Sequence, residues 1–200
     1  MAKTATEDAR TEILNSAISV FARKGYAGTG VQEILDPIQL SKPTLYYYFE
    51  SKAGLFKAIL EHAYEESYGL IEQAASSADT CEEKLVGIAR ALFDFTVENQ
   101  DLTRLVLATL FAAPEEIPPA SINLTRRRKI FELVLNILKA AQNAEEIDKS
   151  YDPNDLAHGF FGAVSHRTRS YLLLQNSELD EVLARKIVAL FLNGARKGKK

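Results

Sequence analysis

Apolar residues recur along this chain at intervals of three and four, the spacing of a helix with one buried face. The first such stripe covers residues 13–21 and ends at Lys24 and Gly25, a pair typical of a helix C-terminus. Further stripes cover residues 55–63, 85–95, 102–110, 130–138 and 182–191. No strand-type alternation stands out, so the pattern predicts an all-α protein of about nine helices.

Polar residues between the stripes predict where several helices begin and end. Thr29 with Gln32, and Thr80 with Glu83, have the spacing of capping boxes, in which side chains satisfy the first backbone N–H groups. Pro37 should end the helix that Thr29 begins, because the residue before a proline avoids helical geometry. Other helix starts are expected at Ser41, at Ser51, at Asp152–Pro153 and at residues 177–180.

The segment from Ser41 to Lys52 has a composition unlike that of a core helix. It combines three consecutive tyrosines with two lysines and several hydroxyl residues. Three adjacent helical residues span nearly a full turn, so Tyr46, Tyr47 and Tyr48 cannot all point inward. Tyrosine is apolar along its ring and hydrogen-bonding at its tip, and lysine binds phosphate, so this surface suits a DNA groove.

Two short helices joined by a tight turn, with a longer helix before and another after, form a helix-turn-helix unit. The second short helix of such a unit lays its N-terminal residues against base edges in the major groove. Leu45 and Phe49, four residues apart on one face, should anchor this helix in the core. The alternative for the tyrosines is a packing cluster against neighbouring helices.

Composition narrows the class of protein without deciding it. The charged fraction of 26% and hydrophobic fraction of 46% are ordinary for a globular protein. The net charge is −3, yet the segment from Arg10 to Lys57 is mildly positive, which permits DNA binding. No apolar run reaches the roughly 18 residues of a membrane span, and no signal peptide is evident. The single cysteine, Cys81, excludes an internal disulfide, so we expect a cytoplasmic protein with no membrane association.

An ordered set of residues between Arg10 and Glu61 carries a more specific signal. These residues are Phe21, Lys24–Gly25–Tyr26, Gly28–Thr29, Ser41–Lys42, Thr44 through Phe49, Ser51–Lys52 and Leu55–Phe56. They resemble the TetR family of transcriptional regulators. The resemblance implies an N-terminal three-helix DNA-binding domain with a helix-turn-helix at residues 1–50. It also implies a helical-bundle domain for ligand binding and dimerisation at residues 51–200.

The resemblance further implies a set of DNA contacts. Phosphate contacts are implied for Thr29, Tyr48 and Lys52, base or nearby backbone contacts for Lys42, Pro43 and Thr44, and phosphate or thymine-methyl contacts for Tyr46 and Tyr47. The chain departs from the family where Ile38–Gln39 replace the usual Ala-Gly pair of the turn, and at Gly30 and Ala53–Gly54. The altered turn leaves open a helical sensor or interaction protein with weakened DNA binding.

As a family member the chain would be a homodimeric repressor that binds a near-palindromic double-stranded operator and is released by a small apolar or aromatic effector. Candidate effector-binding residues lie on the middle helices. They are Phe93, Leu110, Phe111, Phe131, His158, Phe160, Arg167 and Tyr171. In a single sequence, however, a pocket wall cannot be distinguished from a core.

Catalytic, metal and cofactor chemistry is not indicated. His158 and His166 lie two turns apart on one predicted helix, too far for the i, i+4 pair of a metal site. The sequence contains no evident nucleophile–base spacing and no phosphate-binding loop. We therefore expect neither an enzyme nor a protein with a bound metal or cofactor.

Overall fold

The computed structural model describes residues 2–119, 121, 124–174 and 178–195, without the side chains of residues 2–7, 124, 126, 127 and 195. Within these ranges the chain forms nine α-helices and two 3₁₀ turns, with no strand, and the predicted all-α class is confirmed. The elements are α1 (Ala2–Lys24), α2 (Val31–Leu35), η1 (Asp36–Ile38), α3 (Lys42–Phe49), α4 (Lys52–Ser76), α5 (Cys81–Glu98), α6 (Gln100–Phe111), η2 (Pro114–Glu116), α7 (Leu124–Asn143), α8 (Pro153–Leu174) and α9 (Glu181–Ala195). Each of these helices falls short of the length or the hydropathy that a bilayer span requires.

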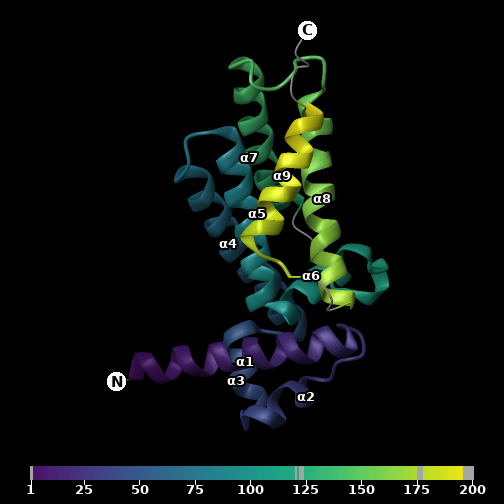
Figure 1. Ribbon diagram of the computed structural model, residues 1–200. Helices are drawn as coiled ribbons and strands as arrows, with labels where there is room; N and C mark the ends of the chain where they lie inside the picture. Colours follow the sequence, from purple (N-terminus) through teal and green to yellow (C-terminus); the bar gives the residue numbers. More distant parts are fainter. Residues whose placement is uncertain (1, 120, 122–123, 175–177, 196–200) are drawn as a thin grey trace. The chain divides into compact units, whose positions relative to one another are not determined.

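The helices group into two compact units, the first made of Met1–Glu65 and Asn99–Asn123. Helices α2 and α3 lie together against α1, and α6 packs on α1 as well (Figure 1). The hydroxyl of Ser16 donates to the carbonyl of Ile34 at 2.6 Å and fastens α2 to α1. The fully buried residues of this unit include Ile13, Ala17, Ile34, Leu35, Leu45, Leu55 and Ile59.

The second unit consists of Glu66–Glu98 and Leu124–Lys200, and so holds the end of α4 with α5, α7, α8 and α9. Helix α9 packs on α5 and on α8, with which it runs side by side in Figure 1. A continuous apolar core joins these helices. The grouping differs from the sequence-based division at residue 50, because the first half of α4 and all of α6 pack with the N-terminal helices.

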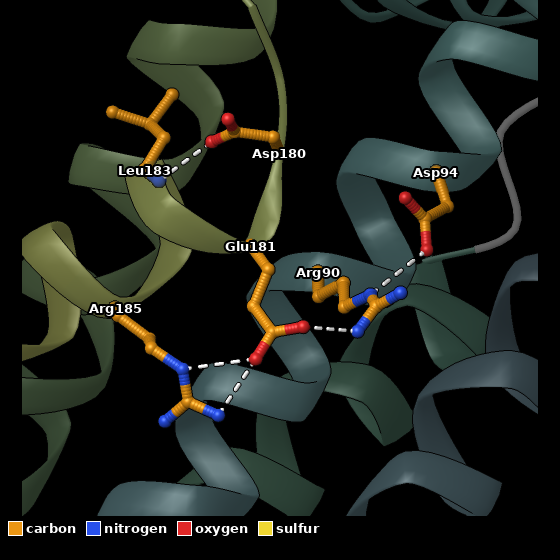
Figure 2. A network of polar contacts seen from close by, with 6 residues as sticks. All are labelled: Arg90, Asp94, Asp180, Glu181, Leu183 and Arg185. Carbon is orange, nitrogen blue, oxygen red and sulfur yellow. Dashed lines mark hydrogen bonds and ion pairs between the residues drawn. The ribbon is translucent and has the colours of Figure 1, made fainter.

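A charged network ties the start of α9 to α5 (Figure 2). Glu181 forms ion pairs with Arg90 of α5 and with Arg185 of α9. The Nε and Nη2 atoms of Arg185 lie 2.9 and 2.7 Å from Glu181 Oε1. The hydrogen bonds from Arg185, together with the positive charges of both arginines, lower the pKa of Glu181. Beside it, Asp180 Oδ1 accepts the N–H of Leu183 at 2.7 Å and so caps the helix.

Several predicted helix boundaries are confirmed. Helix α1 ends at Lys24, and Gly25 has φ +71°, the left-handed conformation of a helix C-terminus. Thr80 Oγ1 accepts the N–H of Glu83 at 3.2 Å at the start of α5. Asp152 caps α8 by accepting the N–H of Asn154 at 2.7 Å. The last helix begins directly after Asp180, while residue 177 lies outside the described ranges.

One prediction about α2 is wrong, and another is confirmed in its outcome but not in its reason. Its N-cap is Gly30 rather than Thr29, and the carboxylate of Glu33 accepts the Gly30 N–H at 2.9 Å. The capping box is therefore shifted by one residue. It keeps the bond from the N-cap N–H to the glutamate but lacks the bond from a side-chain hydroxyl, since glycine has no side chain. Helix α2 ends at Leu35, before Pro37, as predicted. Asp36, which precedes the proline, is nevertheless helical at φ −56° and ψ −45°, so the chain tightens into η1 after α2 ends. A 3₁₀ turn tolerates proline at its first positions because the missing N–H has no partner there.

Candidate nucleic-acid interface

Helix α3 has one buried face and one exposed face. Leu45 is fully buried and Phe49 is 5% exposed, as the sequence predicts, and they hold the helix in the core of the first unit. On the opposite side Tyr47 is 77% and Tyr46 44% exposed, and Lys42 and Pro43 are also exposed. These four lie at helical spacings of three and four, so they form one continuous stripe. We name Lys42, Pro43, Tyr46 and Tyr47 the α3 stripe.

The remaining predicted contacts on α3, Thr44 and Tyr48, are four residues apart and lie along one edge of the stripe. Tyr48 is half-buried, and its ring lies 5.0 Å from that of Tyr47 in an edge-on arrangement. Thr44 is half-buried, and its Oγ1 lies 2.9 Å from the hydroxyl of Ser41, the N-cap residue of the helix. This contact fixes the Thr44 hydroxyl at the N-terminal end of α3. Ser41 thus caps the helix by its position and carbonyl, and its side chain makes no capping bond.

The turn between α2 and α3 keeps a conformation that usually calls for glycine. Gln39 has φ +52° and ψ +33°, which is left-handed and strained for a residue with a Cβ atom. Its N–H donates to the carbonyl of Asp36, and the next N–H, of Leu40, donates to that of Leu35, both at 3.3 Å. The turn therefore keeps its left-handed residue although glycine is replaced by Gln39, and this replacement costs conformational energy.

Thr29, an implied phosphate contact, faces the interior. It is 3% exposed, and its hydroxyl donates to the carbonyl of Gly25 at 2.7 Å, closing the turn between α1 and α2. At the surface of the same turn, Lys24 forms an ion pair with Glu33. Hydrogen bonds from Lys24 and from the backbone N–H of Gly30 lower the pKa of Glu33. The Thr29 side chain therefore has a structural role within the turn.

Lys52, the other implied phosphate contact outside α3, is also engaged within the protein. Its Nζ donates to the carbonyls of Tyr26 and Thr29, at 2.9 and 2.8 Å, and lies 4.2 Å from the centre of the Tyr26 ring. The side chain is thus directed toward the turn after α1.

Two of the candidate effector-binding residues, Leu110 and Phe111, belong to the first unit at the end of α6. Phe111 is 81% exposed, and it borders a cavity of about 390 Å³. Three rings, of Phe21, Tyr26 and Phe56, contribute to the cavity wall, and each packs against the other two. Of the two candidates, only Phe111 lines this cavity.

The other six candidates belong to the second unit, and they do not share one environment. They are Phe93, Phe131, His158, Phe160, Arg167 and Tyr171. Phe93 and Phe160 are fully buried members of the core, whereas His158 and Arg167 are exposed. The structure brings Phe131 and His158 together, with ring centres 4.6 Å apart.

No group of three or more metal-ligating side chains was found among the described residues. Burial raises the pKa of the Cys81 thiol to about 11, which leaves it protonated and unreactive at neutral pH. Among the described residues, neither observation therefore points to a metal site or to a reactive thiol.

Three residues shape the interface although sequence reasoning gave them no role or only marked them as departures. Tyr26 holds Lys52, and Gln39 forms the left-handed turn. At Gly54, an added Cβ would lie 2.0 Å from the carbonyl oxygen of Phe49, so only glycine fits between α3 and α4. The signal for Gln39 and Gly54 was their departure from the family pattern. Tyr26 stood within the motif but offered no sign of its partner.

Comparisons with known proteins agree with this geometry. Residues 13–59 match the family described as bacterial regulatory proteins, tetR family. FasR, an HTH-type transcriptional activator of Mycolicibacterium smegmatis, is 28% identical over 111 residues, which make up 56% of this chain and 51% of FasR. YttP, a probable HTH-type transcriptional regulator of Bacillus subtilis, is 29% identical over 136 residues, or 66% of this chain and 64% of YttP. The chain thus spans between half and two thirds of the length of these relatives.

The fold is also found in solved structures. A putative fatty acid metabolism regulator of Clostridium perfringens superposes with a TM-score of 0.76 at 26% identity, covering 94% of this chain and 100% of that one. The similarity therefore extends through both compact units. The helix-turn-helix geometry and the family match thus place residues 13–59 in the TetR family of transcriptional regulators, and the chain shares its fold over nearly its whole length with a solved structure described as a regulator.

Proposed function

We propose that the chain is a transcriptional regulator that binds double-stranded DNA through α3. The observation that carries the proposal is the α3 stripe: an ammonium group and two tyrosine rings stand exposed on a helix whose other face is anchored by Leu45 and Phe49. Such a stripe offers donors to phosphates and base edges, and apolar ring surface to thymine methyl groups. Thr44 and the half-buried Tyr48, four residues apart, extend it along one edge.

The proposed regulator acts as a homodimer. Helices α8 and α9 carry exposed aliphatic side chains, among them Leu173, Leu174, Val182 and Leu190, the last 76% exposed. Exposed aliphatic residues on adjacent helices suit the self-complementary contact of a two-fold dimer. Two copies would place two α3 helices on half-sites about one helical turn apart, which requires a near-palindromic operator.

The proposed effector is a small apolar molecule that binds the dimer and releases it from DNA. The protein would then act as a repressor, located in the cytoplasm. A ligand can shift a protein between two states only by its differential affinity for them. The Clostridium perfringens neighbour is described as a putative fatty acid metabolism regulator, so fatty acids are the first class to test. Phe111 of the first unit and the Phe131–His158 pair of the second are the first residues to vary.

Selection of bound duplexes from a random pool tests the DNA-binding proposal. We expect enrichment of a near-palindrome, with an affinity that falls steeply as salt rises because bound lysines release counterions from phosphates. Leu190→Asp should weaken dimer formation and with it the preference for paired half-sites. Failure to retain any duplex, at low salt and with a fully folded protein, would overturn the proposal and favour a helical sensor that binds a protein partner.

A further inference from the structure

The first residue of α4, Lys52, occupies a site built from the turn after α1. Its Nζ donates to the carbonyl oxygens of Tyr26 at 2.9 Å and Thr29 at 2.8 Å. These two residues precede Lys52 in the sequence by 26 and 23 positions, respectively. The Tyr26 ring lies beneath the same nitrogen, 4.2 Å from ring centre to Nζ. The two carbonyls thus take two of the three ammonium donors, and the aromatic face attracts the positive charge.

Electrostatics explain why this site matters for a lysine at the start of a helix. The N-terminus of a helix carries a partial positive charge, which disfavours a cation in the first turn. Two carbonyl oxygens and the negative face of the Tyr26 ring offset that repulsion. Withdrawing Lys52 toward a phosphate would leave both carbonyls without this donor, although Tyr26 O also accepts the N–H of Thr29 at 3.3 Å.

The turn that Lys52 holds sets the position of the helix-turn-helix. Within the turn, the Thr29 hydroxyl donates a hydrogen bond to the carbonyl of Gly25. The residue after Thr29, Gly30, is the N-cap of α2, so the turn leads directly into that helix. The Tyr26 ring also packs against Phe56 of α4, with the two ring centres 5.1 Å apart, so it gives a second contact between the turn and α4. Because α2 has only five residues, its direction depends on such anchors rather than on its own stability.

We propose that Lys52 is a positioning residue that locks the α1–α2 turn to α4 and thereby orients α3, and that it does not contact DNA phosphate. This role rests on the proposed DNA-binding function. Lys42 serves as the contrast, because it is exposed on the α3 stripe. The two lysines therefore differ in how binding should depend on salt when each is removed.

The test compares Lys52→Met, Lys52→Arg, Tyr26→Leu and the control Lys42→Met on the duplex selected by the wild type. Affinity is measured at several salt concentrations and referred to the active fraction found by stoichiometric titration. Lys52→Arg keeps a cation with donors for both carbonyls and a plane for the ring. Tyr26→Leu removes no charge and leaves both carbonyls in place, so weaker binding at an unchanged salt slope would not come from the loss of an ion pair with phosphate. Exchange of the Thr29 amide with solvent reports the turn in the absence of DNA.

Loss of charge-assisted hydrogen bonds of this kind predicts roughly tenfold weaker binding for Lys52→Met at every salt concentration, with the salt slope of the wild type. Tyr26→Leu should weaken binding in the same way, Lys52→Arg should restore it, and Lys42→Met should lower the slope by about one. A slope lowered by about one in Lys52→Met, with normal binding by Tyr26→Leu, would overturn the proposal in favour of a phosphate contact.

An unchanged affinity of the active fraction in Lys52→Met, together with a lower melting temperature, would also overturn it, by making the role purely one of stability. If the wild type bound no duplex, the proposed function would fail and the positioning role with it. Faster exchange of the Thr29 amide in Lys52→Met would then still demonstrate the contact, so the two failures are distinguishable.

Discussion

Helix α3 of the first unit and helices α8 and α9 of the second expose different kinds of apolar surface. On α3 the exposed rings are tyrosines, which end in a hydroxyl group and stand beside Lys42. On α8 and α9 the exposed apolar residues are leucines and a valine, with no polar tip. The first surface suits a partner with phosphates and base edges, and the second suits a partner of its own kind. The chemistry of the exposed residues, more than the amount of apolar surface, thus separates a DNA-binding face from a subunit contact.

The units also differ in what holds them together. In the first, helices of five and eight residues each bury only two residues and are further oriented by single polar contacts, such as those of Lys52 and of Ser16 with Ile34. In the second, helices of fifteen to twenty-two residues share one apolar core. Atoms at particular positions should therefore matter most in the first unit, and buried volume in the second.

Phe160→Ala should give the largest loss of stability. Phe160 is fully buried and packs edge-on against Phe161, with ring centres 5.5 Å apart. Deleting such a ring leaves a cavity and costs about 3–5 kcal/mol, measured by urea unfolding. A loss below about 1 kcal/mol would contradict a packed core at Phe160 and point to a ligand cavity beside it.

Gly54→Ala should give the next largest effect and should act on DNA binding too. A Cβ at residue 54 would lie 2.0 Å from the carbonyl oxygen of Phe49, so the junction between α3 and α4 must shift. Overpacking of this kind costs about 1–3 kcal/mol, and the displaced α3 should bind the selected duplex more weakly.

Gly69→Ala is the matched control on the same helix. A Cβ there meets nothing within 4 Å, so the variant should gain up to about 1 kcal/mol from helix propensity alone. Equal stabilities and equal DNA affinities for Gly54→Ala and the wild type would show that the junction relaxes freely.

Gln39→Gly should stabilise the protein. Gln39 is left-handed at φ +52°, a conformation that costs a residue with a Cβ about 1–2 kcal/mol and glycine almost nothing. Part of this gain is cancelled by the greater freedom of glycine in the unfolded chain, so we expect about 0.5–1 kcal/mol by urea unfolding. Lys57→Gly, at an exposed helical position, should instead lose about 1 kcal/mol. A destabilised Gln39→Gly would mean that the glutamine side chain makes a contact worth more than the strain.

Glu181→Gln should have the smallest effect, and one that depends on pH. Because Arg185 and Arg90 lower the folded-state pKa of Glu181, its ionised form stabilises the protein above the ordinary carboxyl pKa. That contribution disappears as pH falls through the lowered folded value. The melting temperatures of wild type and variant should therefore differ near pH 7 and converge once the pH has fallen below the lowered folded-state pKa of Glu181. The gap should shrink in an Arg185→Met background, and a gap that widened toward acid pH would contradict the assignment.

The sequence predicted features that depend on neighbours along the chain. Helix periodicity and local caps predicted the elements, and the burial of Leu45 and Phe49 followed from their spacing on one helix. The predicted cap of α2 was wrong by one residue because the Thr29 hydroxyl donates backward to Gly25 O, four residues earlier, and not to the start of α2. A short-range pattern cannot reveal which of two acceptable bonds a hydroxyl makes.

Long-range partners could not be predicted. The carbonyls that hold Lys52 come from residues 26 and 23 positions away, and backbone carbonyls leave no trace in a sequence. Phe93 and Phe160 were candidate pocket residues, and both lie in the packed core. A buried aromatic residue has the same helical spacing in either setting, so periodicity could not separate the two.

The central claim is that the exposed face of α3 binds DNA, and it is tested most directly by the affinity of the Tyr46→Ala/Tyr47→Ala double variant for the selected duplex. Both rings are exposed, so the melting temperature should stay within about 2 °C of that of the wild type. Each contact to a base or its methyl group is worth about 1–3 kcal/mol, so the affinity should fall roughly 100-fold. An unchanged affinity in the folded double variant would contradict the assignment of this face to DNA.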